Sequence, residues 1–184
     1  MTPSLKTAQP ISWCTPLDKK SLTLREVALF GILAALTFGA KVAMSFLPNI
    51  EPVSLMVMLY AVVFGRKGLY PIYLYVFMEI LFYGIQLWNI NYLYVWAILF
   101  VAARFLKNSE SALAWALLAG VFGLLFGVLC APVYLFSGGV SFAVAWWIEG
   151  IPFDLLHCAG NFVMAFVLFL PLKKLLSQLY AKIQ

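Results

Sequence analysis

Long apolar runs, separated by short segments with charge, glycine or proline, make up the chain from about Val27 onward. Several runs approach the roughly 20 helical residues that cross a hydrocarbon core of about 30 Å, and none alternates as the strands of a membrane barrel do. A helix satisfies its own backbone hydrogen bonds in lipid, so the pattern predicts membrane-spanning helices. We predict six of them, over residues 24–46, 52–65, 69–87, 90–106, 111–135 and 151–176.

Three segments depart from a simple series of spans. The second predicted helix is short, which suggests a tilted or partly re-entrant segment. Residues 136–150, "FSGGVSFAVAWWIEG", are predicted to form a long loop with an interfacial helix. Residues 1–22 contain three prolines and no apolar core, so we predict a cytoplasmic tail and no cleavable signal, with the six-helix domain over residues 23–184.

Composition narrows the class of protein. The chain is 65% hydrophobic and 10% charged, with a mean hydropathy of +0.99, which lies outside the usual range for soluble domains. The expected fold is an all-α integral membrane protein, a six-transmembrane-helix bundle. Its three scattered cysteines indicate neither a disulfide framework nor a metal cluster.

Basic residues predict the orientation. Eleven of the twelve Lys and Arg residues lie in the tail and first turn, in the turns after the second and fourth helices, and at the C-terminus: Lys6, Lys19, Lys20, Arg25, Arg66, Lys67, Arg104, Lys107, Lys173, Lys174 and Lys182. Cytoplasmic loops carry an excess of Lys and Arg, so this side and both termini are predicted to be cytoplasmic. The net charge of +5 then reflects topology, not nucleic-acid binding. We expect a multi-pass protein of a bacterial plasma membrane.

The predicted outer end is rich in aromatic and amide side chains. Asp154, His157 and Asn161 follow at i, i+3 and i+7, so they share one stripe of the sixth helix, and such a stripe should face protein or water. The rings could form an interfacial belt, but with the amides they suit a planar or amide-bearing ligand. The predicted substrate-binding residues are Glu51, Trp88, Asn89, Asn91, Tyr92, Trp146, Trp147, Asp154, His157 and Asn161.

Two lone charges, Lys41 and Glu79, also reach the outer halves of their helices. Asp154 and His157 could instead form a catalytic pair or part of a metal site. A helix-start carboxylate after Pro152 and a hydrogen-bonded core imidazole explain them more simply. Zinc usually takes three protein ligands, and the chain has one histidine. Nucleophile-elbow and phosphate-loop motifs are missing from the sequence, so we predict no catalytic residue, no metal, no cofactor and no ATPase activity.

The first helix carries small residues at every fourth position, Gly31, Ala35 and Gly39. Small residues at this spacing let another helix approach closely in lipid. The stripe could serve packing within the bundle or docking of a partner subunit.

The combination of six short helices, the small-residue stripe and "LPNIEPVSLMVMLYAVVFGRKGLY" (47–70) resembles the substrate-binding S component of energy-coupling factor (ECF) vitamin transporters. The resemblance covers residues 24–176. It implies a subunit that captures a vitamin outside and then docks on a shared EcfT-type transmembrane scaffold driven by two ATPase subunits. An Ala-xxx-Ala motif meets that scaffold in the family; Gly31, Ala35 and Gly39 are the nearest match here, with glycine at two positions.

The substrate is predicted from shorter stretches. "NIEPVSL", "LWNINYLYVW" and "WWIEGIPFDLLHCAGNF" resemble most the cobalamin-specific (CbrT-type) members of the family. The histidine-bearing N-terminus of the metal-ion members is absent. Anionic vitamins would use Lys or Arg, and Lys41 alone is available outside. An S component for pantothenate, folate or a queuosine-type precursor is the alternative, followed by a membrane enzyme or an assembly subunit.

Overall fold

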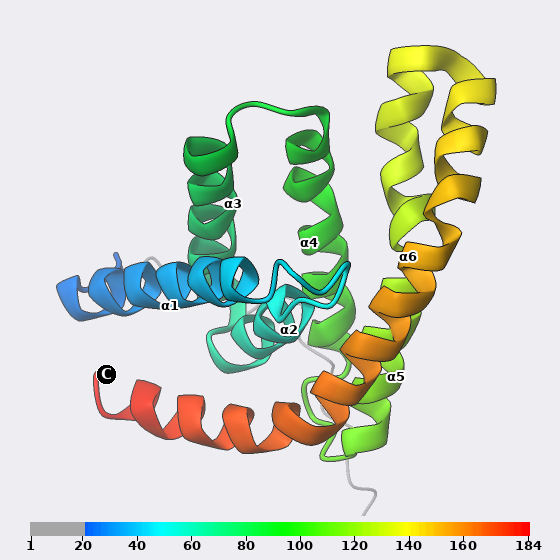
Figure 1. The fold of residues 1–184 in the computed structure, drawn as a ribbon. Coiled ribbons are helices and arrows are strands. Elements are labelled where there is room, and N and C mark those ends of the chain that lie inside the picture. Colours follow the sequence, from blue (N-terminus) through cyan, green and yellow to red (C-terminus); the bar gives the residue numbers. More distant parts are fainter. Residues whose placement is uncertain (1–20) are drawn as a thin grey trace, which may run out of the picture.

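The computed structural model describes residues 21–184, and all regular structure within them is helical (Figure 1). The all-α class is therefore confirmed, while the predicted tail falls almost entirely outside the described residues. The elements are α1 (Leu24–Ala43), α2 (Val53–Val63), the 3₁₀ helix η1 (Gly65–Gly68), α3 (Leu69–Tyr83), α4 (Leu87–Phe105), α5 (Ala112–Leu124) and α6 (Phe126–Ala181).

Two helical stretches in the described part of the chain, Leu24–Ala43 and Ala112–Ala181, are long and apolar enough to cross a membrane. Val53–Val63 is apolar but shorter. Six membrane crossings, and the side on which the termini lie, stay predictions.

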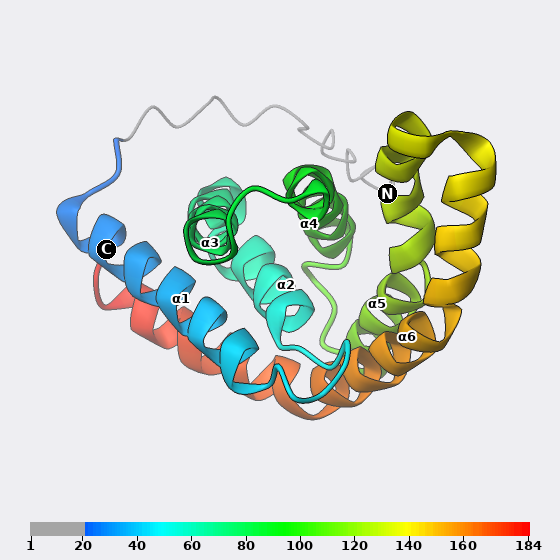
Figure 2. The same ribbon diagram turned by 45° about the horizontal axis from the view of Figure 1, so that its top comes forward.

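The short helix α2 is the centre of the bundle. Its 11 residues extend roughly 16 Å at 1.5 Å per residue, too short to cross a bilayer upright. Most of its side chains are buried, and it packs against α1, α3, α4 and α6. The other helices curve around it, as Figure 2 shows. The short second helix predicted from the sequence is thus enclosed by protein.

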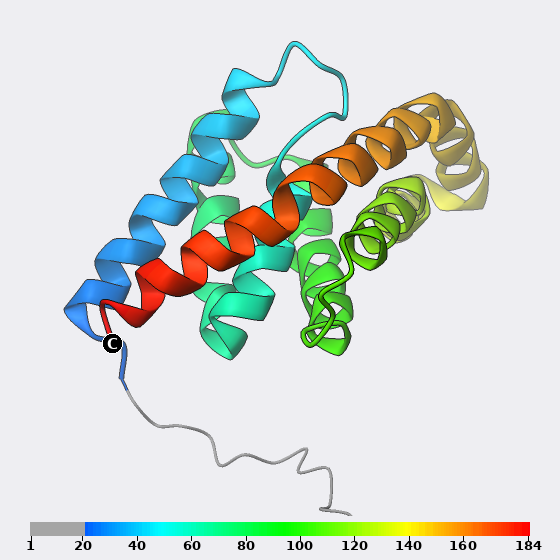
Figure 3. The same ribbon diagram turned by 90° about the horizontal axis from the view of Figure 1, so that it is seen from below.

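One carboxylate ties three elements together at one end of the molecule. Glu26 forms a capping box with Thr23 at the start of α1. Its Oε1 also accepts hydrogen bonds from Lys67 Nζ at 2.6 Å and from the Tyr180 hydroxyl at 2.8 Å. The start of α1 and the end of α6 therefore lie side by side (Figure 3).

The predicted loop over residues 136–150 is wrong. The chain is helical up to residue 138, reverses at Gly139, and is helical again from residue 140 to Ala181. Gly139 has φ 79°, a conformation that costs glycine little, and it is the residue within α6 at which the backbone departs from helical geometry. The predicted fifth helix is α5 plus the first arm of α6, separated at Leu125.

The sixth helix begins at residue 140, after the break at Gly139, and not at the predicted residue 151. Proline is common at helix starts, which favours a start near Pro152, but Pro152 lies inside α6. The remaining predicted helices were right to within a few residues at each end. The two arms of α6 form a helical hairpin that projects beyond α3 and α4 (Figure 1).

Candidate functional site

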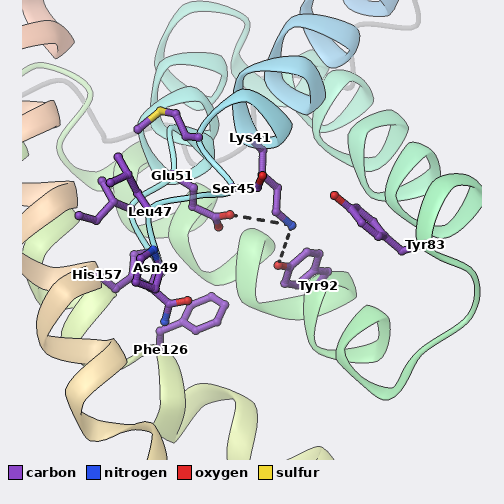
Figure 4. Close-up of a pocket in the computed structure, with 12 residues that line it drawn as sticks. Lys41, Ser45, Leu47, Asn49, Glu51, Tyr83, Tyr92, Phe126 and His157 are labelled. Carbon is purple, nitrogen blue, oxygen red and sulfur yellow. Dashed lines mark hydrogen bonds and ion pairs between the residues drawn. The ribbon is translucent and has the colours of Figure 1, made fainter.

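A cavity of about 340 Å³ lies at the end of α1 that is opposite to Glu26. The wall is built from the last turn of α1, the connection to α2, and side chains of α3, α4 and α6 (Figure 4). Its lining residues are Lys41, Met44, Ser45, Leu47, Pro48, Asn49, Ile50, Glu51, Tyr83, Tyr92, Phe126 and His157. The cavity thus gathers segments that the sequence analysis placed at one end of the bundle.

An ion pair lies at the wall of this cavity. Lys41 Nζ is 2.9 Å from Glu79 Oε2 and donates a hydrogen bond to the Tyr92 hydroxyl at 3.2 Å. Glu79 has no exposed surface. Buried charges are rare unless they are paired, so α1 and α3 are positioned against each other by this contact.

Aromatic rings surround the same ammonium group. Lys41 Nζ lies 5.0 Å from the centroid of Tyr92, 5.4 Å from that of Trp88 and 5.9 Å from that of Tyr75. Tyr92 also packs edge-to-face on Trp88 at 5.0 Å. The negative faces of such rings attract a cation within about 6 Å, so this wall stabilises positive charge.

Glu51 interacts with Lys41 more weakly than Glu79 does. Its Oε2 is 3.9 Å from Lys41 Nζ, beyond hydrogen-bond distance, and its side chain is 15% exposed. Burial raises the pKa of the Glu51 carboxyl, Lys41 opposes this effect, and Glu79 adds to it. A carboxyl group that can still accept a strong hydrogen bond therefore borders the cavity.

His157 reaches the cavity from α6. The residue is 2% exposed, and its ring packs edge-to-face on Phe126 with centroids 4.9 Å apart. Neither ring nitrogen has a hydrogen-bond partner among the described residues. The hydrogen-bonded core imidazole that we expected is therefore not what the structure shows. A neutral imidazole has one donor and one acceptor, and both are unused here.

Of the ten predicted substrate-binding residues, the structure brings four together. Glu51, Tyr92 and His157 line the cavity, and Trp88 contacts Lys41 and Tyr92 beside it. The other six lie outside the cavity wall that the described residues form.

Two residues of the predicted polar stripe on α6 make contacts within the protein. The backbone N–H of Gly127 donates to both carboxylate oxygens of Asp154 at 3.1 Å, which caps the first turn of α6. A Cβ at residue 127 would collide with the Asp154 carboxylate, so this approach requires glycine. Asn161 Nδ2 donates to Ser54 Oγ at 3.0 Å and joins α6 to α2.

The two predicted asparagines of α4 also serve local contacts. Asn89 Oδ1 accepts from the backbone N–H of Gln86 at 2.5 Å, at the start of α4. Asn91 Oδ1 accepts from the Tyr94 hydroxyl at 3.1 Å. Both side chains are buried.

The two predicted tryptophans of α6 lie in its helical hairpin. Trp146 stacks on Tyr134 with centroids 3.9 Å apart, which joins the two arms of the hairpin. Trp147 is 37% exposed and approaches Gly127. These rings stabilise the hairpin and leave the cavity to other side chains.

Lys41 and Glu79 are the charged residues of the site that are missing from the predicted set. The uncharged lining residues that were not predicted are Met44, Ser45, Leu47, Pro48, Asn49, Ile50, Tyr83 and Phe126. Lys41 and Glu79 were noticed as lone charges in the outer halves of predicted helices, and the chain offers few alternatives for pairing there. Charges inside a membrane usually pair with one another, so this rule could have placed Lys41 and Glu79 together.

The small-residue stripe faces away from the bundle. Ala35 is exposed, and a Cβ added at Gly31 or Gly39 would meet nothing within 4 Å. The buried side of α1 includes Phe30 and Ala34. Packing among the described helices therefore does not explain the stripe.

Titratable side chains do not gather into a metal site in the part of the chain that the structure describes. Groups of three or more His, Cys, Asp or Glu residues placed to hold a metal ion are absent there. Comparisons with protein families, with curated proteins and with solved structures found no match to this chain.

Proposed function

We propose that this chain is the S component of an ECF-type importer: it binds a vitamin at the extracellular side and delivers it through an EcfT-type scaffold driven by two ATPase subunits. The sequence resemblance supplies the family. The single observation that carries the proposal is a cavity at one end of the helical bundle whose wall combines aromatic rings, carboxyl groups and an unpaired imidazole.

Basic side chains at the other end support the orientation. Lys67 is bonded to Glu26 at the start of α1, and Arg104 Nη1 donates to the carbonyl of Ala61 at 3.3 Å near the end of α2. Lys41, in contrast, lies at the cavity. Under the positive-inside rule, the basic end belongs in the cytoplasm and the cavity then faces outward.

The outer face of α1 supports the assembly step. Gly31, Ala35 and Gly39 form a surface with little side-chain volume, and close backbone approach is a main source of helix association in lipid. We assign this surface to the scaffold subunit. Ligand capture and docking then use different sides of one helix, since Lys41 lines the cavity.

The resemblance favours cobalamin as the ligand. A volume of about 340 Å³ is at the small end of the roughly 300–1,000 Å³ that is typical of sites for drug-sized molecules. Cobalamin is larger than such molecules, so its binding requires the cavity to enlarge. A smaller vitamin fits the cavity as it stands and is the second candidate.

Uptake by cells that lack their own vitamin importers tests the proposal. The chain is expressed with an ECF scaffold and its two ATPases, and a panel of labelled vitamins including cobalamin, pantothenate and folate is offered. One vitamin should accumulate, and accumulation should require all the subunits. Vesicles that contain this chain alone should bind the vitamin without ATP-dependent accumulation. Accumulation by the chain alone, or failure of every vitamin to bind, would refute the proposal.

A further inference from the structure

The cavity has more acidic than basic side chains. Three charged side chains of the described residues lie there, one base and two acids: Lys41, Glu51 and Glu79. Glu79 binds Lys41 at 2.9 Å, whereas Glu51 stays 3.9 Å away and borders the empty volume. The single base is already neutralised, so the cavity has no positive charge to offer an anion.

The aromatic wall favours positive charge as well. Tyr92 and Trp88 hold the Lys41 ammonium within 5.4 Å of their ring centroids. Tyr83 and Phe126 add further ring surface to the lining. Aromatic faces attract cations and also stack on flat rings, so this wall suits a ligand that is both planar and cationic.

Two buried side chains at this site have polar atoms without a hydrogen-bond partner. Both nitrogens of His157 and Oε1 of Glu79 are buried and have no hydrogen-bond partner among the described residues. A buried polar group without a hydrogen-bond partner lowers the stability of the fold. A bound ligand can supply the missing hydrogen bond and so remove this cost. The imidazole offers one donor and one acceptor, the combination that the edge of a nitrogen heterocycle satisfies.

We propose, on the basis of the proposed function, that the cavity selects a planar nitrogen heterocycle with a positive charge, with Glu51 as its counter-ion and His157 hydrogen-bonded to its edge. The volume of about 340 Å³ limits the ligand to a small ring system. This inference develops the second candidate of the proposed function, a smaller vitamin that fits the cavity as it stands, and it disfavours pantothenate and folate because they are anions.

Three pyridine derivatives that share one ring but differ in charge test this inference. Binding of the N-methylnicotinamide cation, neutral nicotinamide and anionic nicotinate to the full chain in lipid nanodiscs is measured by calorimetry and tryptophan fluorescence. We expect the cation to bind at least tenfold more tightly than nicotinamide, and nicotinate to bind most weakly. Glu51→Gln should abolish the preference for the cation. Glu110→Gln is the matched control, because Glu110 pairs with Lys173 outside the cavity and is 80% exposed.

Equal or tighter binding of nicotinate would overturn the inference, and so would a cation preference that survives in Glu51→Gln. If that variant does not fold, the order of the three rings on the unaltered chain decides. If no ring binds while cobalamin or another vitamin does, the inference fails and the proposed function stands. If neither the rings nor any vitamin binds, both fail.

Discussion

Lys41 on α1 and Glu79 on α3 form an ion pair of 2.9 Å at the wall of the cavity, and Glu79 is entirely shielded from solvent. The same helix α1 exposes Ala35 on its outer surface. One helix therefore joins the two regions that we assign to ligand capture and to docking. A shift of α1 would therefore change the cavity and the docking surface together.

Removal of one member of this pair should destabilise the fold. Lys41→Met leaves Glu79 and Glu51 without their base, and loss of one partner of a buried pair costs about 3–5 kcal/mol. Glu79→Gln should cost less, because Glu51 can take over the ammonium. The double variant Lys41→Met/Glu79→Gln should be more stable than Lys41→Met, because it no longer leaves the Glu79 carboxylate buried without a partner. Denaturant unfolding in detergent measures all three.

Lys173→Met is the control for this series, because Lys173 pairs with Glu110, which is 80% exposed. An exposed pair contributes about 0–1 kcal/mol. Additive effects of the two substitutions in the double variant would mean that Lys41 and Glu79 do not act as a pair.

His157→Leu should weaken binding of the vitamin identified by the uptake assay. The side chain lines the cavity with both nitrogens unpaired, and loss of a hydrogen bond in a desolvated site costs about 1–3 kcal/mol, or roughly five- to 150-fold in affinity. Trp146→Ala should leave affinity unchanged, since Trp146 stacks on Tyr134 in the hairpin. Calorimetric titration of both variants is decisive. Wild-type affinity in His157→Leu, or a large loss in Trp146→Ala, would reverse these assignments.

Asp154 should stabilise the fold and should not contribute to ligand binding. Asp154→Ala removes the acceptor of the buried Gly127 N–H, which should lower the free energy of unfolding by about 1–3 kcal/mol. Gly127→Ala should do the same by collision with Asp154. Gly150→Ala, where a Cβ meets nothing within 4 Å, should be neutral or slightly stabilising. A melting temperature for Gly127→Ala equal to that of Gly150→Ala would contradict this role, as would a selective loss of ligand affinity in folded Asp154→Ala.

Ala35→Trp should separate docking from binding. The bulky ring blocks close approach of a partner helix, so copurification with the scaffold and the ATPases should fall, while vitamin affinity stays unchanged. Leu36→Trp is the control, because Leu36 is also exposed but lies about 100° around the helix from Ala35. Wild-type copurification of Ala35→Trp, or equal losses in both variants, would show that the stripe is not the docking surface.

The helices themselves could be predicted because their causes are local. Apolar runs, the Thr23–Glu26 capping box and the basic turn at Arg66 lie within short stretches, and the first four helices match their predicted ranges to within a few residues. The predicted loop over residues 136–150 failed for a local reason too. A stretch with three glycines, one charge and a proline just after it allowed several helix ends, and the positive φ of Gly139 selects one of them.

The chain's own composition and periodicity determined an all-helical, strongly apolar protein, and they predicted a set of aromatic and polar side chains for its site. Only the tertiary structure decided which of those side chains share a cavity. Asp154 and Asn161 are bound by Gly127 and Ser54, while Lys41 meets Glu79. These partners are 27 to 107 residues apart in sequence, so helix packing brings them together, and no local pattern encodes which partner a buried polar group will find.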